Sequence, residues 1–183
     1  MERYRMFAST REAVVQRKQE VQEKFEQSAT NLLNLDSTRD GDMMDDPLML
    51  RMLEEQEQLR VELLQLGRYL GSETELITVE NAEEEPVVGV GYQVRLKTTY
   101  SDGFEEEFDV TIGTPIDVRY LKNHPNSPFN DDTHLLISDE TPLAQALMGK
   151  QVRQSVTYEA GGGNNKAKIL EIALSPLVQG GLE

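Results

Sequence analysis

The sequence contains no cysteine and no tryptophan among its 183 residues, and aromatic residues make up only 6%. Without cysteine, disulfides and thiolate metal sites are excluded, and no redox compartment can be inferred. Hydrophobic residues amount to 38%, which supports a modest core. An elongated molecule with a small core fits this composition better than one compact globule.

Basic residues are also scarce, since 18 Lys and Arg against 33 Asp and Glu give a net charge of −15. This charge argues against bulk binding to nucleic acid, which needs clustered Lys and Arg to neutralise phosphates. An acidic protein can still act beside nucleic acid if it docks on a basic protein surface. No apolar run approaches the roughly 20 residues that span a bilayer, and residues 1–5 lead into no apolar segment. We therefore expect no signal peptide, no membrane association and a cytoplasmic location.

Two stretches in the first third repeat apolar residues at coiled-coil spacing. The first stretch has two seams, which contain Val14, Val21, Ser28 and Leu35, and Phe25 and Leu32. The second stretch has one stripe, which contains Met49, Met52, Gln56, Leu59, Leu63, Leu66 and Leu70. They predict helices of about 30 and about 24 residues that project on the order of 40 Å as an antiparallel hairpin.

The segment between the two stretches carries stop and start signals. Asp36-Ser37-Thr38 interrupts the first helix, Asp40-Gly41 forms a turn, and Asp46-Pro47 supplies an N-cap and a first-turn proline. We therefore place the hairpin in residues 1–75 and its tip in residues 36–47. Periodicity alone does not separate an intramolecular hairpin from a dimerising coiled coil, so the second arrangement stays open.

The second half changes to a period of two after a linker over residues 76–86. Apolar and polar residues alternate over 92–100 and again over 104–112, around a Ser101-Asp102-Gly103 turn, which predicts a β-hairpin with one buried face. Residues 113–134 are expected to be a polar loop. A short helix should begin at Thr141-Pro142 and end at Gly149. Two last strands, near residues 152–158 and 167–174, are joined by a Gly-rich turn, so residues 87–176 form a small, mostly antiparallel sheet domain.

The segment Thr141-Pro142-Leu143-Ala144-Gln145-Ala146-Leu147-Met148-Gly149-Lys150 resembles the C-terminal signature of the GreA/GreB family. In that family a similar segment with a leading Ser precedes the last two strands of an FKBP-like domain. The resemblance implies an α+β protein in which a coiled-coil hairpin is followed by an FKBP-like domain. It also implies that Pro142, Leu143, Ala146, Leu147, Gly149 and Lys150 help to bind RNA polymerase.

The hairpin tip carries a second resemblance. Gly41-Asp42-Met43-Met44-Asp45-Asp46 is similar to the Gly-Asp-Leu-Ser-Glu-Asn tip of cleavage-promoting members. Asp42 falls on the family's aspartate, and Asp45 replaces its glutamate with a side chain about 1.5 Å shorter. Met43 and Met44 stand between the acids as expected tip contacts.

The resemblance implies an accessory factor and not an enzyme. Its partners would be bacterial RNA polymerase and the RNA 3′ end in the elongation complex, which the tip reaches through the secondary channel. Asp42 and Asp45 would be the catalytic carboxylates, because short carboxylates suit the hard cation Mg²⁺ that two-metal hydrolysis requires. That Mg²⁺ belongs to the polymerase active site, and the chain needs no cofactor of its own.

Several alternatives stay open beside this interpretation. Some acidic-tipped homologues occupy the channel and inhibit the polymerase, and a coiled-coil adaptor or chaperone is a further class. The tip aspartates can be plain turn and cap residues. A metal site of His124, His134, Asp131 and Asp132 has poor zinc spacing, and Gly161–Gly163 suits a hairpin turn better than a phosphate loop.

The apolar side of the first predicted helix can pack against the apolar stripe of the second within one hairpin, so we expect an elongated monomer. Sedimentation velocity over a range of concentrations should give one species with the mass of a single chain and a high frictional ratio. A stable dimer held through residues 5–70 would contradict this expectation.

Overall fold

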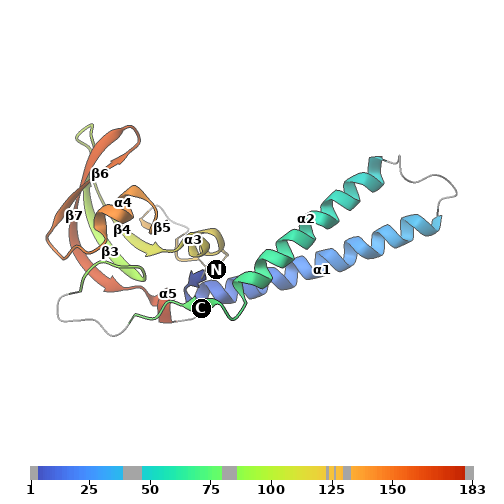
Figure 1. The fold of residues 1–183 in the computed structure, drawn as a ribbon. Coiled ribbons are helices and arrows are strands. Elements are labelled where there is room, and N and C mark those ends of the chain that lie inside the picture. The colour runs from blue at the N-terminus through green and yellow to red at the C-terminus, as the bar shows by residue number, and fades with distance from the viewer. Residues whose placement is uncertain are drawn as a thin grey trace. The chain divides into compact units, whose positions relative to one another are not determined.

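The computed structural model describes residues 4–38, 47–79, 86–122, 124–125, 127–129 and 133–179 (Figure 1). The chain forms two compact units. The hairpin unit is Val14–Thr74, and the sheet unit combines Met1–Ala13 with Glu75–Glu183. The hairpin is therefore inserted into the chain of the sheet unit, whereas the sequence had assigned residues 1–75 to the hairpin as a whole.

The hairpin unit consists of two long helices, α1 (Ala8–Thr38) and α2 (Pro47–Tyr69), of 31 and 23 residues. Figure 1 shows them alongside each other within the hairpin. Arg17 near the start of α1 forms an ion pair of 2.9 Å with Glu62 near the end of α2, so the helices run antiparallel. This confirms the predicted hairpin.

The heptad seams explain which sides of these helices are buried. Val14, Val21 and Leu66 are fully buried, and the other described seam positions are half-buried. Apolar residues off the seams, such as Leu33 and Leu64, are exposed. The period therefore identified the inner side of each helix correctly.

The sheet unit is built on five strands in the order β5-β4-β3-β7-β6. Their bounds are β3 (Tyr92–Thr99), β4 (Glu105–Gly113), β5 (His134–Ser138), β6 (Ser155–Ala160) and β7 (Gly163–Leu174). β3 pairs antiparallel with β4 and β7, and β6 pairs antiparallel with β7. Only β5 runs parallel to its neighbour, β4, within the described sheet. The α+β class and the mostly antiparallel sheet are thereby confirmed, and the FKBP-like description is compatible with them.

One face of this sheet is apolar and the other is charged. Val94 and Leu96 are fully buried in a core that includes Ile169 and Leu147. The alternate residues of β3 point to the other face, where Lys97 pairs with Glu105 at 2.8 Å. Helix α4 (Pro142–Leu147) covers part of the apolar face and packs against β6, as Figure 1 shows.

The segment 113–134, predicted to be a loop, contains helix α3 (Pro115–Leu121). Thr114 is its N-cap, Pro115 occupies the first turn, and Asp117 completes a capping box. These residues carry the start signal of a helix in the sequence. The prediction was wrong because seven residues are too few to show a helical period.

Short elements that precede and follow the hairpin in the sequence complete the sheet unit. β1 (Tyr4–Met6) pairs with β2 (Thr74–Leu76), and the Ile77 N–H donates to the Met6 carbonyl at 2.9 Å. Helix α5 is Pro176–Gln179. A second apolar core gathers the following residues: Phe7, Ala13, Ile77, Leu121, Phe129, Leu136, Leu177 and Val178.

The Asp117 carboxylate joins the N-terminal segment to α3. One oxygen accepts hydrogen bonds from the Phe7 N–H at 2.8 Å and the Thr10 hydroxyl at 2.5 Å. The other accepts from the Thr114 N–H at 2.7 Å, with the Thr114 hydroxyl 2.8 Å away. Asp117 is fully buried, so these donors replace the water that it loses.

Burial raises the pKa of Asp117 above its ordinary value, while the hydrogen bonds from Thr10, Phe7 and Thr114 oppose the rise. Because the pKa is raised on folding, the contribution of this group to stability grows as the pH falls. Acidification therefore does not weaken the sheet unit through Asp117.

No helix in the described ranges is long and apolar enough to cross a membrane.

We expect Asp117→Ala to lower the free energy of unfolding by about 2–4 kcal/mol, because it removes a helix cap and leaves buried donors without an acceptor. Differential scanning calorimetry on the full chain measures the change. Asp109→Ala is the control, since that carboxylate accepts a hydrogen bond from Gln93 on a half-buried site and should cost below about 1 kcal/mol. Equal losses in the two variants would contradict the role given to Asp117.

Candidate functional site

The predicted hairpin tip lies mostly outside the described residues. The tip residues that the structure does not describe include Asp42 and Asp45, the expected contacts Met43 and Met44, and the neighbouring Asp40, Gly41 and Asp46. Helix α2 begins at Pro47 as predicted, whereas α1 continues through Asp36-Ser37-Thr38, where the sequence predicted that helix to end. The role of the tip therefore stays a prediction.

The predicted docking segment, residues 142–150, is helix α4 with the turn that follows it. The Thr141 hydroxyl accepts a hydrogen bond from the Ala144 N–H at 3.4 Å and donates to the Ser138 carbonyl at 2.8 Å. Pro142 occupies the first turn. After the helix, Gly149 takes a φ of 76°, a conformation that favours glycine. The start and stop signals in the sequence are thereby confirmed.

Backbone pairing fixes the end of this segment against the strand-like stretch before β3. The Gly149 N–H donates to the Val88 carbonyl at 2.9 Å, and the Val88 N–H donates to the Lys150 carbonyl at 2.8 Å. Val88 itself is buried in the core. Gly149 and Lys150 are therefore held rigidly while their outer surfaces stay exposed.

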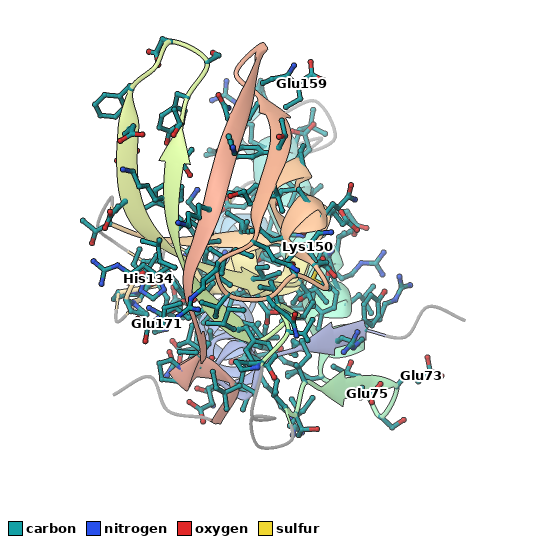
Figure 2. The ribbon with its side chains drawn as sticks, turned by 90° about the vertical axis from the view of Figure 1, so that its left-hand side faces the viewer. Glu73, Glu75, His134, Lys150, Glu159 and Glu171 are labelled. Atoms are coloured by element: carbon teal, nitrogen blue, oxygen red, sulfur yellow. The ribbon has the colours of Figure 1, made fainter. Side chains whose placement is uncertain are left out.

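Burial separates the residues of this segment into two groups. Ala144 and Leu147 are fully buried in the core, and Leu143 and Ala146 are half-buried against it. The exposed residues are Pro142, Gln145, Met148, Gly149 and Lys150, and Figure 2 labels Lys150.

Leu147, expected to contact a partner, offers no surface for one, because it packs α4 onto the sheet. Met148 is 39% exposed, although the sequence analysis did not select it as a contact residue. The helical spacing of Leu143, Ala144 and Leu147 is the signal in the sequence that could have placed Leu147 on the packed side of α4.

A polar cleft of about 380 Å³ is bordered by β1, by the start of α3 and by the two residues that precede Thr141, the N-cap of α4. It is lined by Tyr4, Arg5, Thr114, Pro115, Ile116, Asp139 and Glu140. The lining combines a guanidinium with two carboxylates, so it has no strong preference for a charged ligand of either sign. The Asp139 N–H donates to the Gly113 carbonyl at 2.8 Å, which fixes this edge of the cleft to β4.

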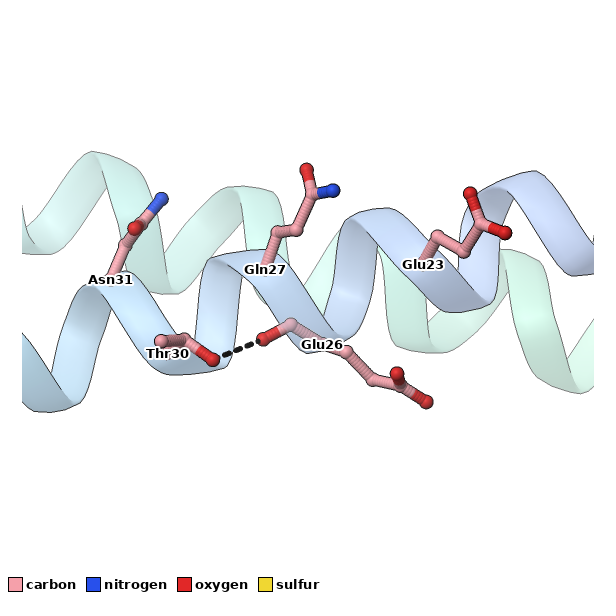
Figure 3. A pocket seen from close by; sticks show the side chains of 5 residues that line it. All are labelled: Glu23, Glu26, Gln27, Thr30 and Asn31. Atoms are coloured by element: carbon pink, nitrogen blue, oxygen red, sulfur yellow. Dashed lines mark hydrogen bonds between the residues drawn. The ribbon is translucent and has the colours of Figure 1, made fainter.

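A second concavity, of about 480 Å³, lies on α1 in the hairpin unit. Figure 3 shows its lining, which is Glu23, Glu26, Gln27, Thr30 and Asn31. The Thr30 hydroxyl donates to the Glu26 carbonyl at 2.9 Å within the helix. These residues form a solvated polar face, and they bring no reactive pair together.

The described residues contain no group of three or more His, Cys, Asp or Glu that could hold a metal ion. His134 lies 2.9 Å from the Thr111 hydroxyl and packs edge-on against Phe129, so its surroundings are structural. Asp131 and Asp132 lie outside the described residues. Gly161 and Gly162, with φ of 64° and 79°, form the turn between β6 and β7 that the sequence predicted.

A family model described as transcription elongation factor GreA/GreB, C-terminal part, matches residues 83–174, which contain both the sheet and α4. The chain belongs to the GreA/GreB family. The transcription elongation factor GreA of Thermoanaerobacter pseudethanolicus is 32% identical over 110 residues, which are 58% of this chain and 60% of that protein. The GreA of Bacillus cereus strain AH187 is 29% identical over 97 residues, which are 53% and 52% of the two chains. The chain thus spans 60% or less of these GreA/GreB relatives.

The crystal structure of GreA factor homolog 1 of Thermus thermophilus is also similar to the chain, at 18% identity over 94% of this chain and 99% of that one. The TM-score is 0.39, which does not establish a shared arrangement of the whole chain. Membership of the GreA/GreB family rests on residues 83–174.

We expect Leu147→Ala to lower the free energy of unfolding by about 2–5 kcal/mol, because it opens a cavity in the core of the sheet unit. Lys150→Ala should change it by no more than about 0.5 kcal/mol, because the side chain is exposed. Calorimetry on both variants tests the division between packing and surface residues. Equal effects would show that the division is wrong.

Proposed function

We propose that this chain is a transcription elongation factor that binds bacterial RNA polymerase and stimulates the polymerase's own cleavage of backtracked RNA. The observation that supports this best is the presence, in one chain, of the GreA/GreB sheet domain and an antiparallel helical hairpin. The chain acts as an accessory factor in the cytoplasm, as a monomer, and the reaction takes place in the polymerase.

In this proposal the sheet unit docks on the polymerase. The exposed residues Pro142, Gly149 and Lys150 form the contact surface, with Met148 beside them. Their backbone is fixed by the Thr141 cap and by the pairing with Val88. A rigid surface loses little entropy on binding, which favours this segment as the anchor.

The hairpin then carries its tip through the secondary channel toward the RNA 3′ end. Asp42 and Asp45 would share a Mg²⁺ ion with the polymerase active site, and this donor set fits the ion because both ligands are carboxylates. When bound, Mg²⁺ supplies an activated water for hydrolysis of the RNA backbone. The two aspartates contribute negative charge, and Met43 and Met44 contact the channel.

We expect Asp42→Asn and Asp45→Asn each to abolish stimulated cleavage, leaving the slow intrinsic rate of the polymerase. Asparagine keeps the size of the side chain but removes the charge that a weakly bound Mg²⁺ requires. Affinity for the polymerase should stay within about twofold, since docking depends on the sheet unit. Cleavage of RNA in stalled elongation complexes and a separate binding titration measure the two quantities.

Asp40→Asn and Asp46→Asn are matched controls, because they remove the same charge from positions that the sequence predicts to be a turn and a helix cap, and they should lower cleavage only slightly. Asp45→Glu restores the family's usual residue and should raise the cleavage rate if reach is limiting. If all four Asn variants behave alike, the specific ligand role is wrong. A wild-type chain that competes for the channel without stimulating cleavage would identify an inhibitory homologue instead.

A further inference from the structure

Phe104 is exposed although the chain is poor in aromatic residues. It precedes β4 at the turn after β3, and 60% of its surface is open to solvent. The other four phenylalanines are buried or half-buried. An aromatic side chain that is mostly exposed contributes little to folding, and aromatic residues are typical anchors of protein interfaces.

Phe104 does not stand alone, because Tyr100 stacks on it. The ring centroids are 6.0 Å apart and the planes differ by 25°. The Tyr100 hydroxyl donates to Glu106 at 2.9 Å. Burial and this carboxylate raise the pKa of Tyr100 to about 12, so the hydroxyl remains a donor well above neutral pH. We call Tyr100 and Phe104 the aromatic tip.

The turn that carries the aromatic tip is tightly ordered. The Tyr100 N–H donates to the Phe104 carbonyl at 2.8 Å, and the Gly103 N–H donates to the Tyr100 carbonyl at 2.9 Å. Asp102 accepts from the Phe104 N–H at 2.9 Å. Gly103 has a φ of 86°, which glycine adopts without strain.

A buried asparagine fastens this turn to the neighbouring hairpin. The Asn165 carbonyl accepts from the Ser101 N–H at 3.1 Å, and its amide donates to the Ala160 carbonyl at 3.2 Å. A Cβ atom at Gly163 would collide with the Ser101 hydroxyl, so the two turns are in direct contact. Figure 2 shows both hairpins reaching the same end of the sheet, where Glu159 is labelled. The aromatic tip is therefore preorganised.

We propose that the aromatic tip is a protein-docking surface whose partner is an apolar pocket bordered by basic residues. A preorganised aromatic pair binds such a pocket at low entropic cost. The proposal rests on the proposed function, because the partner that we assign is RNA polymerase. It adds a contact separate from the exposed residues of α4.

The charges around the aromatic tip determine the chemistry of the partner. Asp102 and Glu106 are exposed carboxylates beside it. The basic residues Lys97 and Lys166 on the adjoining strands alternate with buried residues, so their side chains point to the opposite face of the sheet. Acidic neighbours attract a basic protein surface and repel phosphates, so they favour a protein over a nucleic acid that would stack on the rings.

Phe104→Ala in the full chain tests the aromatic tip, with bacterial RNA polymerase core enzyme as the binding probe. We expect the dissociation constant to rise about tenfold or more, as for an interface anchor. The thermal midpoint should change only slightly, because Phe104 is mostly exposed and loses only its stacking contact with Tyr100. Leu135→Ala is the matched control: that side chain is 36% exposed on edge strand β5, and its loss should leave binding within about twofold.

A charge variant tests the basic border of the pocket. Asp102→Asn with Glu106→Gln keeps the hydrogen bonds of the turn but removes two negative charges. The association rate should fall severalfold at low salt and converge with that of the wild type at high salt. Glu107→Gln with Glu171→Gln removes the same charge from the opposite face of the sheet and should have a smaller effect.

The outcomes separate this proposal from the proposed function. If the wild type binds the polymerase and Phe104→Ala binds equally well, the aromatic tip is not a docking surface, and the proposed function stands. If the wild type does not bind the polymerase, both fall. If Phe104→Ala weakens binding to a single-stranded RNA oligonucleotide but not to the polymerase, the tip stacks on bases and the protein-docking proposal is overturned.

Discussion

The buried Asp117 carboxylate is the interaction on which the sheet unit depends. It accepts hydrogen bonds from Phe7 and Thr10 at the start of the chain and from Thr114 at the start of α3. The second apolar core forms around the elements that it joins. Without this carboxylate, residues 4–13 would lose two of the hydrogen bonds that fix them to the sheet unit, whose five-stranded sheet begins only after the hairpin.

Rigid backbone supports both surfaces proposed to contact a partner. The turn after α4 is paired with Val88, and the aromatic tip is fixed through Asn165. In each case a buried residue holds exposed side chains in place, so binding would not have to order them. Two such surfaces on one small domain would define its orientation on a partner better than either does alone.

Periodic elements could be predicted from the sequence, and aperiodic ones could not. The seams through Val21 and Leu66 and the alternation through Val94 and Leu96 predicted both helices and the central strands. The three-residue strands β1 and β2 and the seven-residue α3 were missed because they are too short for a period. Family resemblance located the segment of α4, but only burial distinguishes Leu147, which packs, from Lys150, which is exposed.

The insertion of the hairpin into the sheet unit has a consequence for the order of folding. Arg17 and Glu62 are 45 positions apart, so the hairpin can form as soon as its own residues are synthesised. Ser9 donates to the Leu177 carbonyl across 168 positions, and Phe7 meets Asp117 across 110. Such distant contacts close late because the loop entropy must be overcome first. The first residues of the sheet unit therefore cannot complete their contacts until the last ones have been synthesised. If translation stalls before α5, the hairpin unit can be folded while the sheet unit is still incomplete.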